Sequence, residues 1–391
     1  MSLMYGRQAV DDEDVRAVTA VLRSDYLTQG PVVGQFEQEL ARICGSDFAV
    51  AANSATSALH LACLALGVAP GDEVWTSPVS FVASANCAVY CGASVRFVDI
   101  DPQSFNMSPQ RLLDMLRDAD RHCRLPKVVI PVHLGGTPCE MVEIVSICRD
   151  FGVRILQDAS HALGATIASR PVMSPEFGDI AVTSFHPVKI VTTAEGGAAV
   201  TASKELATIM QRQRSHGITR VPEEMELTPV GPWYYEQIEI GFNYRMPDLF
   251  AALGLSQLKK LDAFVERRNA IVDLYRRLLA PEIFLMQAVG AQMRSSRHLA
   301  LAIPDFERLG ITQSGLFERL QRSGVATTLH YIPIYKHPFH RARLTSQPEC
   351  PIAEWYYHRA VTLPCHPLMK DEDVEQVVRA LMTPIGHQTI F

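Results

Sequence analysis

The chain has 391 residues, of which 48% are hydrophobic and 20% are charged, the composition of a soluble globular protein rather than of a disordered or fibrous one. At about 100–200 residues per domain, this length predicts two or three domains. The 36 basic and 42 acidic residues give a net charge of −6, with no run of five like charges. This charge pattern indicates no nucleic-acid partner.

Nine cysteines, an odd number, are scattered along the chain without a Cys-x-x-Cys pair. They predict neither a disulfide framework nor a structural zinc site. The apolar runs have the length of strands, well below the ~20 residues that span a bilayer, and the first residues lack the apolar core of a signal peptide. We therefore expect a cytoplasmic protein with no membrane partner.

The first half of the chain shows a regular alternation of patterns. Helical spacing of apolar residues predicts helices over 11–22 and 36–43. Strands are then predicted over 48–52, 73–76, 95–98, 127–132 and 154–157, with helices between them over 55–66, 83–90, 108–116 and 141–150. Such alternation is typical of right-handed βαβ units, so we predict a large α/β domain with a mostly parallel sheet flanked by helices.

The second half is more helical. A polar, proline-bearing segment over 217–231 predicts an exposed insertion, and an apolar stripe predicts a long helical region over 248–275. Beyond it we expect strands over 297–303 and 327–331 and helices over 315–323 and 371–382. The chain is thus predicted to divide into 1–275, an N-terminal segment with the large domain, and 276–391, a smaller α+β domain.

The common nucleotide-binding motifs Gly-x-Gly-x-x-Gly and Gly-x-x-x-x-Gly-Lys-Ser/Thr are absent, as is the His-Glu-x-x-His motif of zinc proteases. Small polar residues over 53–58 lie instead between a predicted strand and an apolar helix. Backbone N–H groups and hydroxyls there can close on a phosphate at the positive end of the helix. The alternative is that these residues only cap the helix, because Ser and Thr are common N-cap residues.

Two charged residues suggest the chemistry. Asp158 ends an apolar strand, at the sheet edge where open α/β sheets bind ligands. An aspartate there can keep a heteroaromatic nitrogen protonated, or it can serve as a helix cap. Lys189 has apolar and β-branched neighbours, so we expect a depressed pKa and a Schiff base, the alternative being a surface lysine. With the phosphate-binding segment and a stacking aromatic ring, these are the parts that a pyridoxal 5′-phosphate (PLP) site needs.

From Leu27-Thr28-Gln29-Gly30 to Leu363-Pro364 the sequence resembles the DegT/DnrJ/StrS sugar aminotransferases of the type I PLP-dependent transferase fold. The resemblance is closest to the branch of UDP-4-amino-4,6-dideoxy-N-acetyl-β-L-altrosamine transaminases. The motifs that carry it are Ser54-Ala55-Thr56-Ser57-Ala58, Ser77-Pro78-Val79-Ser80-Phe81-Val82-Ala83, Ser160-His161-Ala162-Leu163-Gly164, Ser184-Phe185-His186-Pro187-Val188-Lys189 and Ala252-Leu253-Gly254-Leu255-Ser256-Gln257-Leu258.

The resemblance assigns roles at the cofactor. It implies that Lys189 forms the Schiff base, that Asp158 pairs with the pyridine nitrogen and that Phe81 stacks on the ring. The phosphate would be held by Ala55, Thr56 and Ser184, and by Asn243 from the neighbouring subunit of a homodimer. His161 stands where many relatives carry glutamine, beside the phenolic oxygen; it can donate a hydrogen bond there, with a charge that titrates near neutral pH, or be a structural histidine.

The resemblance also assigns a substrate rim, for which ordinary loop packing is the alternative. It comprises Tyr5, Asp25, Tyr26, Leu27, Thr28, His330, Tyr331, Ile332 and Pro333. The neighbouring His330, His337 and His340 lack ligand spacing on one helix face and an accompanying cysteine pair, so no metal site is predicted.

The implied activity is that of a PLP-dependent aminotransferase of pseudaminic acid biosynthesis. It would convert a UDP-4-keto-6-deoxy-N-acetyl-hexosamine, UDP-2-acetamido-2,6-dideoxy-β-L-arabino-hex-4-ulose, into its 4-amino sugar, with L-glutamate as donor. The alternatives are a 4-aminotransferase for the D-configured bacillosamine precursor, a PLP-dependent sugar dehydratase and a non-catalytic regulator. Dehydratase relatives carry histidine in place of the lysine, whereas Lys189 is present here. Sequence does not place the few hydrogen bonds that distinguish sugar isomers.

Overall fold

The computed structural model describes residues 3–344 and 346–382, and its centre is a seven-stranded sheet. The strand order is β2-β10-β9-β6-β5-β3-β4. The bounds are β2 (Phe48–Ala52), β3 (Glu73–Thr76), β4 (Ser94–Phe97), β5 (Val128–Ile130), β6 (Arg154–Asp158), β9 (Ile180–Ser184) and β10 (Gly197–Thr201). Neighbouring strands are parallel except β10, which is antiparallel to both β2 and β9. The mostly parallel sheet is confirmed.

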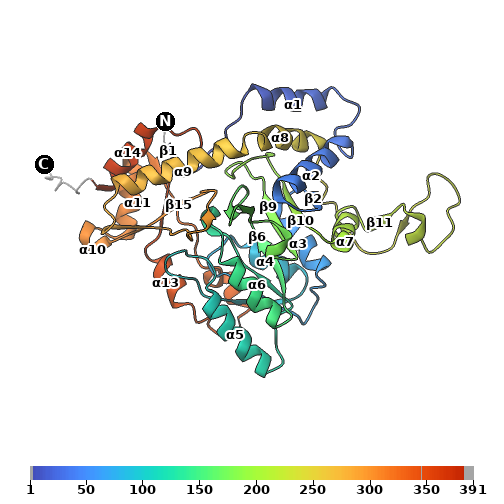
Figure 1. Cartoon of the computed structure of the whole chain (residues 1–391), viewed down its shortest axis with the longest axis horizontal. Coiled ribbons are helices and arrows are strands. Elements are labelled where there is room, and N and C mark those ends of the chain that lie inside the picture. The colour runs from blue at the N-terminus through green and yellow to red at the C-terminus, as the bar shows by residue number, and fades with distance from the viewer. Residues whose placement is uncertain (1–2, 345, 383–391) are drawn as a thin grey trace.

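Helices cover both faces of the sheet (Figure 1). On β2, Ala49 and Ala51 pack into a core with α2, α5, α6 and α8, whereas Val50 and Ala52 pack into a second core with α3, α4 and α7, as the alternation of a strand requires. The bounds are α2 (Pro31–Cys44), α3 (Ala55–Ala65), α4 (Ala83–Tyr90), α5 (Pro109–Arg121), α6 (Met141–Asp150), α7 (Lys204–Arg214) and α8 (Asp248–Leu258). α1 (Asp12–Leu22) packs on α8. The predicted α/β class is therefore confirmed.

A third core lies in the C-terminal part of the chain. There α9 (Leu261–Leu278), α11 (Gln313–Arg322) and α14 (Asp371–Met382) pack against an antiparallel sheet of β13 (Phe284–Met286), β15 (Ala300–Pro304) and β17 (Val361–Leu363). β1 (Leu3–Met4) pairs with β16 (Val325–Ala326) beside this core. The division at residue 275 stays a prediction, and α9 runs across that position.

The remaining elements are short. β7 (Thr166–Ile167), β8 (Arg170–Pro171) and β14 (Met293–Arg294) form one small sheet, and β11 (Ile218–Thr219) pairs with β12 (Glu236–Gln237). Short helices are α10 (Phe306–Leu309), α12 (Pro338–Arg341) and α13 (Pro351–Tyr357), and the 3₁₀ turns are η1 (Leu134–Gly136), η2 (Pro175–Phe177), η3 (Pro222–Glu224) and η4 (Ile334–Lys336). No helix of residues 3–344 and 346–382 is long and apolar enough to cross a membrane.

Several predicted elements differ from the structure, among them the helix over 36–43, which already begins at Pro31. The helical region over 248–275 is broken between α8 and α9, where the Lys260 ammonium turns to the carboxylates of Asp11 and Asp14. The strand over 297–303 begins only at Ala300. The strand over 327–331 is wrong, because the regular pairing ends at β16 and only a single bridge, from Thr328 to Thr362, follows it, with His330 and Tyr331 lining a cavity.

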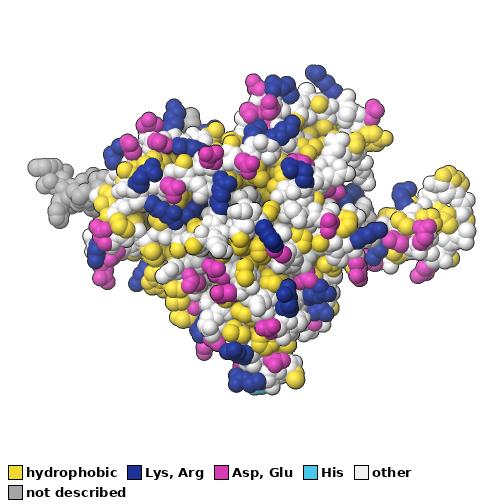
Figure 2. Space-filling model, viewed as in Figure 1, with side chains coloured by type: hydrophobic (Ala, Val, Ile, Leu, Met, Phe, Trp, Pro, Cys, Tyr) yellow, Lys and Arg dark blue, Asp and Glu magenta, His cyan; other side chains and the backbone are white. Residues whose placement is uncertain are grey.

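Residues 217–240 form an arm that projects from the body of the molecule (Figure 1). Figure 2 shows hydrophobic side chains exposed along it beside acidic ones. Leu227, Val230, Trp233 and Ile240 are 67%, 76%, 69% and 81% exposed. The exposed insertion predicted over 217–231 is confirmed, and it carries an apolar surface that its polar sequence did not lead us to expect.

A buried carboxylate anchors the loop before α2. Asp248, the first residue of α8, is fully buried and accepts hydrogen bonds from the backbone N–H groups of Gly30 and Val32 at 3.0 and 2.9 Å. Its own N–H donates to the carbonyl of Leu27 at 3.1 Å. α8 therefore fixes one end of the predicted substrate loop 25–28.

We expect Asp248→Ala to lower the free energy of unfolding by about 1–3 kcal/mol, because two amides lose a buried partner. Asp248→Asn keeps one acceptor oxygen and should lose less. Urea denaturation measures both changes. An alanine variant as stable as the parent chain would show that these bonds contribute nothing.

Candidate active site

The candidate site lies where several strands end at one edge of the central sheet. The register places Gly197, the first residue of β10, beside Ala52 of β2 and beside Ser184 of β9. Asp158 is the last residue of β6 and lies opposite Val182 of β9. Loops that follow the carboxyl ends of parallel strands share one edge, which is where open α/β sheets bind ligands.

A cavity of about 390 Å³ opens at this edge. This volume is in the range of small-molecule and cofactor sites. Its walls include many of the residues singled out from the sequence, namely Tyr5, Ala55, Thr56, Phe81, Asp158, His161, Ser184, Lys189, His330 and Tyr331. Residues far apart in the chain therefore converge on one cavity.

Other predicted site residues do not line this cavity. Asp25, Tyr26, Leu27 and Thr28 lie in the exposed loop before α2, and Ile332 and Pro333 follow Tyr331 outside the walls. Asn243 is exposed at the base of the projecting arm, and its carbonyl accepts a 3.5 Å hydrogen bond from the Asn53 side chain. The roles of these residues stay predictions.

The N-terminus of α3 forms one end of the cavity. Ser54 is the N-cap, and its hydroxyl accepts a 3.1 Å hydrogen bond from the N–H of Ser57. Ala55 and Thr56 follow in the first turn, where helical N–H groups have no intrahelical partner. The capping role and a phosphate-binding role are thus compatible, because the cap leaves those two amides at the cavity.

Glycine is required where β10 passes this helix end. A Cβ atom at Gly197 would lie 2.3 Å from the Ala55 nitrogen and 2.4 Å from its Cα atom. Any side chain at this position would push the start of α3 away from the strand. The absence of a side chain at Gly197 therefore sets the position of the candidate phosphate site.

The Asp158 carboxylate is held from two sides and is 5% exposed. Ser84 Oγ donates to Oδ2 at 2.6 Å, and the Ser160 N–H donates to Oδ1 at 3.1 Å. A turn follows β6, so the helix-cap alternative is wrong. Two donors orient the carboxylate and leave lone pairs for a protonated ring nitrogen at the cavity.

Lys189 is a cavity residue rather than a surface lysine. Burial lowers its pKa to about 8, although the nearby Asp158 charge acts in the opposite direction. The predicted depression is confirmed. Within the described part of the chain its amino group has no hydrogen-bond or ion-pair partner. Near neutral pH a minor fraction of this amine is therefore neutral and able to react, a larger fraction than for an exposed lysine.

His161 is neutral in this setting. Its Nδ1 accepts the N–H of Gly135 at 3.3 Å, which places the proton on Nε2, 3.2 Å from the Tyr331 hydroxyl. Burial, followed by the charge of Lys189, lowers the His161 pKa well below its usual range. The expectation that its charge titrates near neutral pH is wrong, because the side chain is 4% exposed and burial disfavours the charged ring.

Aromatic rings surround the opening. Phe81 is 58% exposed and its ring centroid lies 6.3 Å from that of Tyr331. Tyr5 and His330 lie 5.0 Å apart, and burial lowers the His330 pKa to about 3. An exposed aromatic face beside the cavity suits stacking on a flat ring.

Some residues were missed from the sequence. Ser84, the partner of Asp158, lies one helical turn after Phe81, and that spacing could have indicated it. His298 lines the cavity 4.5 Å from the His161 ring, and its buried Nδ1 has no partner among the described residues. No sequence signal separates His298 from other lone histidines.

The donor set fits PLP. A free amine, an oriented carboxylate, an uncovered helix N-terminus and an exposed aromatic face share one cavity, and each matches one part of the cofactor. Among residues 3–344 and 346–382, no three His, Cys, Asp or Glu side chains are grouped to hold a metal ion.

Comparison with known proteins agrees with this chemistry. The sequence profile of the DegT/DnrJ/EryC1/StrS aminotransferase family matches residues 8–382. The chain belongs to this family. The family's enzymes are PLP-dependent sugar aminotransferases, and structural neighbours have been solved in PLP and PMP forms. The predicted family, fold and cofactor are confirmed.

Individual relatives cover nearly the whole chain. The spore coat polysaccharide biosynthesis protein SpsC of Bacillus subtilis is 36% identical, over 97% of this chain and 96% of its own. The UDP-4-amino-4,6-dideoxy-N-acetyl-beta-L-altrosamine transaminase of Campylobacter jejuni is 35% identical, over 97% of each chain. The solved structure of Helicobacter pylori PseC, an aminotransferase involved in pseudaminic acid biosynthesis, is 30% identical with a TM-score of 0.88, over 97% of this chain and 98% of its own.

We expect Gly197→Ala to weaken PLP binding by about tenfold or more, since a displaced helix end misplaces its N–H donors. Equilibrium dialysis of the full chain measures this. Gly34→Ala is the matched control, because a Cβ atom at Gly34 meets nothing within 4 Å; it should bind PLP normally. Unchanged binding in the Gly197 variant would contradict the assigned phosphate site.

We expect Asp158→Asn to lower the pKa of Lys189 below about 8, because the carboxylate charge is what holds that pKa up against burial. Competitive amine labelling of the PLP-free chain across pH, read by mass spectrometry, gives this pKa. A pKa that stays the same or rises would show that the two groups do not interact.

Proposed function

We propose that this aminotransferase acts on UDP-2-acetamido-2,6-dideoxy-β-L-arabino-hex-4-ulose, with L-glutamate as the amino donor. The convergence of Lys189, Asp158 and the α3 N-terminus on one cavity carries the proposal for the reaction. The choice of sugar draws on the similarity to the altrosamine transaminase of Campylobacter jejuni and to PseC. The pathway served is then pseudaminic acid biosynthesis.

Bound PLP carries the amino group between donor and acceptor and withdraws electrons from the reacting carbon. Lys189 holds the cofactor and, as the free amine, moves a proton at the carbon that gains or loses nitrogen; its pKa of about 8 suits this task near neutral pH. Asp158, oriented by Ser84, keeps the ring nitrogen protonated. Phe81 stacks on the cofactor ring. His161, which also lines the cavity, offers the N–H of its neutral ring as a hydrogen-bond donor.

The rim selects the sugar nucleotide in this proposal. Tyr5, His330 and Tyr331 surround the opening with aromatic rings and a hydroxyl. Such groups can pack on a uracil ring and bond to sugar hydroxyls. The loop 25–28 and residues Ile332 and Pro333 would extend this surface beyond the cavity.

We further propose that the active form is a homodimer. The projecting arm exposes Leu227, Val230, Trp233 and Ile240, which this chain leaves uncovered. An exposed apolar surface of this kind is typical of a protein interface. Asn243 follows directly after the arm, so an arm seated on a second copy would carry Asn243 toward that copy's phosphate site.

The substrate is tested by incubating the enzyme with PLP, ¹⁵N-glutamate and each of the two 4-keto sugars, L-arabino and D-xylo configured. We expect ¹⁵N at C4 of the L-sugar, with kcat/KM at least about tenfold above that for the D-sugar. NMR identifies the product. A preference for the D-sugar would support the bacillosamine alternative, and water loss without amine gain would indicate a dehydratase.

Shared sites are tested by mixing two inactive variants. Lys189→Ala should lose at least about 10²-fold in turnover, and Asn243→Ala should bind PLP poorly. If each site needs both chains, mixed dimers recover up to a quarter of the parent activity, as random pairing leaves half of the chains in mixed dimers with one intact site each. A mixture as inactive as its components would refute shared sites, and a fully active monomer in sedimentation would refute the homodimer.

A further inference from the structure

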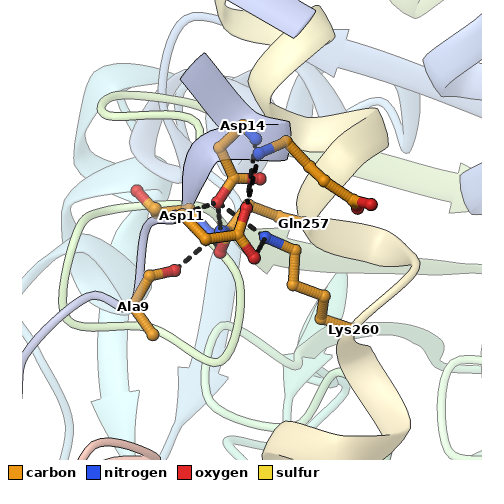
Figure 3. A network of polar contacts seen from close by, with 7 residues as sticks. Ala9, Asp11, Asp14, Gln257 and Lys260 are labelled. Carbon is orange, nitrogen blue, oxygen red and sulfur yellow. Dashed lines mark hydrogen bonds and ion pairs between the residues drawn. The ribbon is translucent and has the colours of Figure 1, made fainter. Parts of the chain in front are cut away.

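A network of polar side chains joins the N-terminal segment to the junction of α8 and α9 (Figure 3). Asp14 of α1 is fully buried, and its Oδ2 accepts hydrogen bonds from Gln257 Nε2 at 2.7 Å and Lys260 Nζ at 2.8 Å. Lys260 also pairs with Asp11 at 2.6 Å. These four side chains do not line the cavity and are not used by the proposed chemistry.

Gln257 connects this network with two segments that border the cavity. Its Nε2 donates to the carbonyl of Ala9 at 2.8 Å, and its Oε1 accepts the N–H of Thr192 at 3.4 Å. Ala9 lies four residues after Tyr5, and Thr192 lies three residues after Lys189. The side chain is 1% exposed, so water does not compete for these bonds.

Arg268 of α9 makes the equivalent connection from the other side. Its guanidinium is fully buried and donates to the carbonyls of Lys189 at 3.4 Å and Cys365 at 2.6 Å. The N–H of Cys365 in turn donates to the carbonyl of Tyr5 at 3.0 Å. No carboxylate pairs with Arg268 among the described residues, so its hydrogen bonds go to backbone carbonyls.

We propose that Gln257 and Arg268 are positioning residues that hold the Lys189–Thr192 segment and the Tyr5–Ala9 segment in one fixed relation. Gln257 bonds directly to both segments, at Thr192 and at Ala9. Arg268 bonds directly to Lys189 and reaches Tyr5 through Cys365. The reactive amine and the aromatic wall of the cavity are thereby set by the same two helices. This inference rests on the proposed role of Lys189 as the reactive amine and of Tyr5 as a substrate contact.

The test uses Gln257→Met, which preserves length and removes all three hydrogen bonds. Without the anchor at Thr192, the partly buried Lys189 becomes more exposed to water, and its pKa in the PLP-free chain should rise from about 8 toward its usual value near 10.4. Hydrogen exchange at residues 5–9 should accelerate. In the PLP-loaded enzyme, KM for the 4-keto sugar should rise about fivefold, the loss of one hydrogen bond's contribution.

Lys260→Met is the matched control, because it breaks the same network at Asp11 and Asp14 but leaves the bonds from Gln257 to Ala9 and Thr192 intact. It should lower the melting temperature and leave the Lys189 pKa, the exchange at residues 5–9 and KM unchanged. Arg268→Lys tests the other anchor if Gln257→Met does not fold, and it too should raise the Lys189 pKa.

The proposal is overturned if the Gln257 variant matches the Lys260 control in the Lys189 pKa and in hydrogen exchange at residues 5–9. Gln257 and Lys260 would then both contribute to stability alone. These two readouts need neither sugar nor donor. A wrong substrate would therefore abolish the KM measurement without affecting them, which separates failure of this inference from failure of the proposed function.

Discussion

The close approach of β10 to the N-terminus of α3 is the constraint on which the site depends. β10 is the one strand of the central sheet that runs against its neighbours, and its first residue, Gly197, lies between Ala52 and Ser184. Only glycine fits there, because a Cβ atom would meet the backbone of Ala55 at 2.3 Å. This contact sets how closely the helix start approaches β10, which in turn pairs with the end of β9 at Ser184.

Electrostatics then follow from burial. The cavity walls include Lys189, Asp158, Glu195 and four histidines, and burial lowers the pKa of all four, His161, His186, His298 and His330. Near neutral pH these histidines are uncharged, which leaves Asp158 and the partly protonated Lys189 as the charged groups deepest in the site. The neutral histidines therefore add no positive charge beside Lys189 and Asp158, the two groups to which the proposal assigns proton transfer and protonation of the ring nitrogen.

Much of this arrangement could be predicted from the sequence. Alternating patterns placed the strands, and strand ends placed Asp158 and residues 53–58 at the same sheet edge. The roles of Phe81, His161 and Tyr5 needed family resemblance. What could not be predicted depends on contacts between distant segments: the tautomer of His161 depends on the N–H of Gly135, the orientation of Asp158 depends on Ser84, and the break between α8 and α9 places Lys260 beside Asp11 and Asp14. A local pattern contains none of these pairings.

The account holds that PLP occupies the cavity between the α3 N-terminus and Asp158. The most direct test is a crystal structure of the full chain with PLP. It should show the phosphate at the amides of Ala55 and Thr56, the ring nitrogen within hydrogen-bond distance of Asp158, and continuous density to Lys189 Nζ. A cofactor bound elsewhere, or one in the cavity with its ring nitrogen turned away from Asp158, would contradict the account.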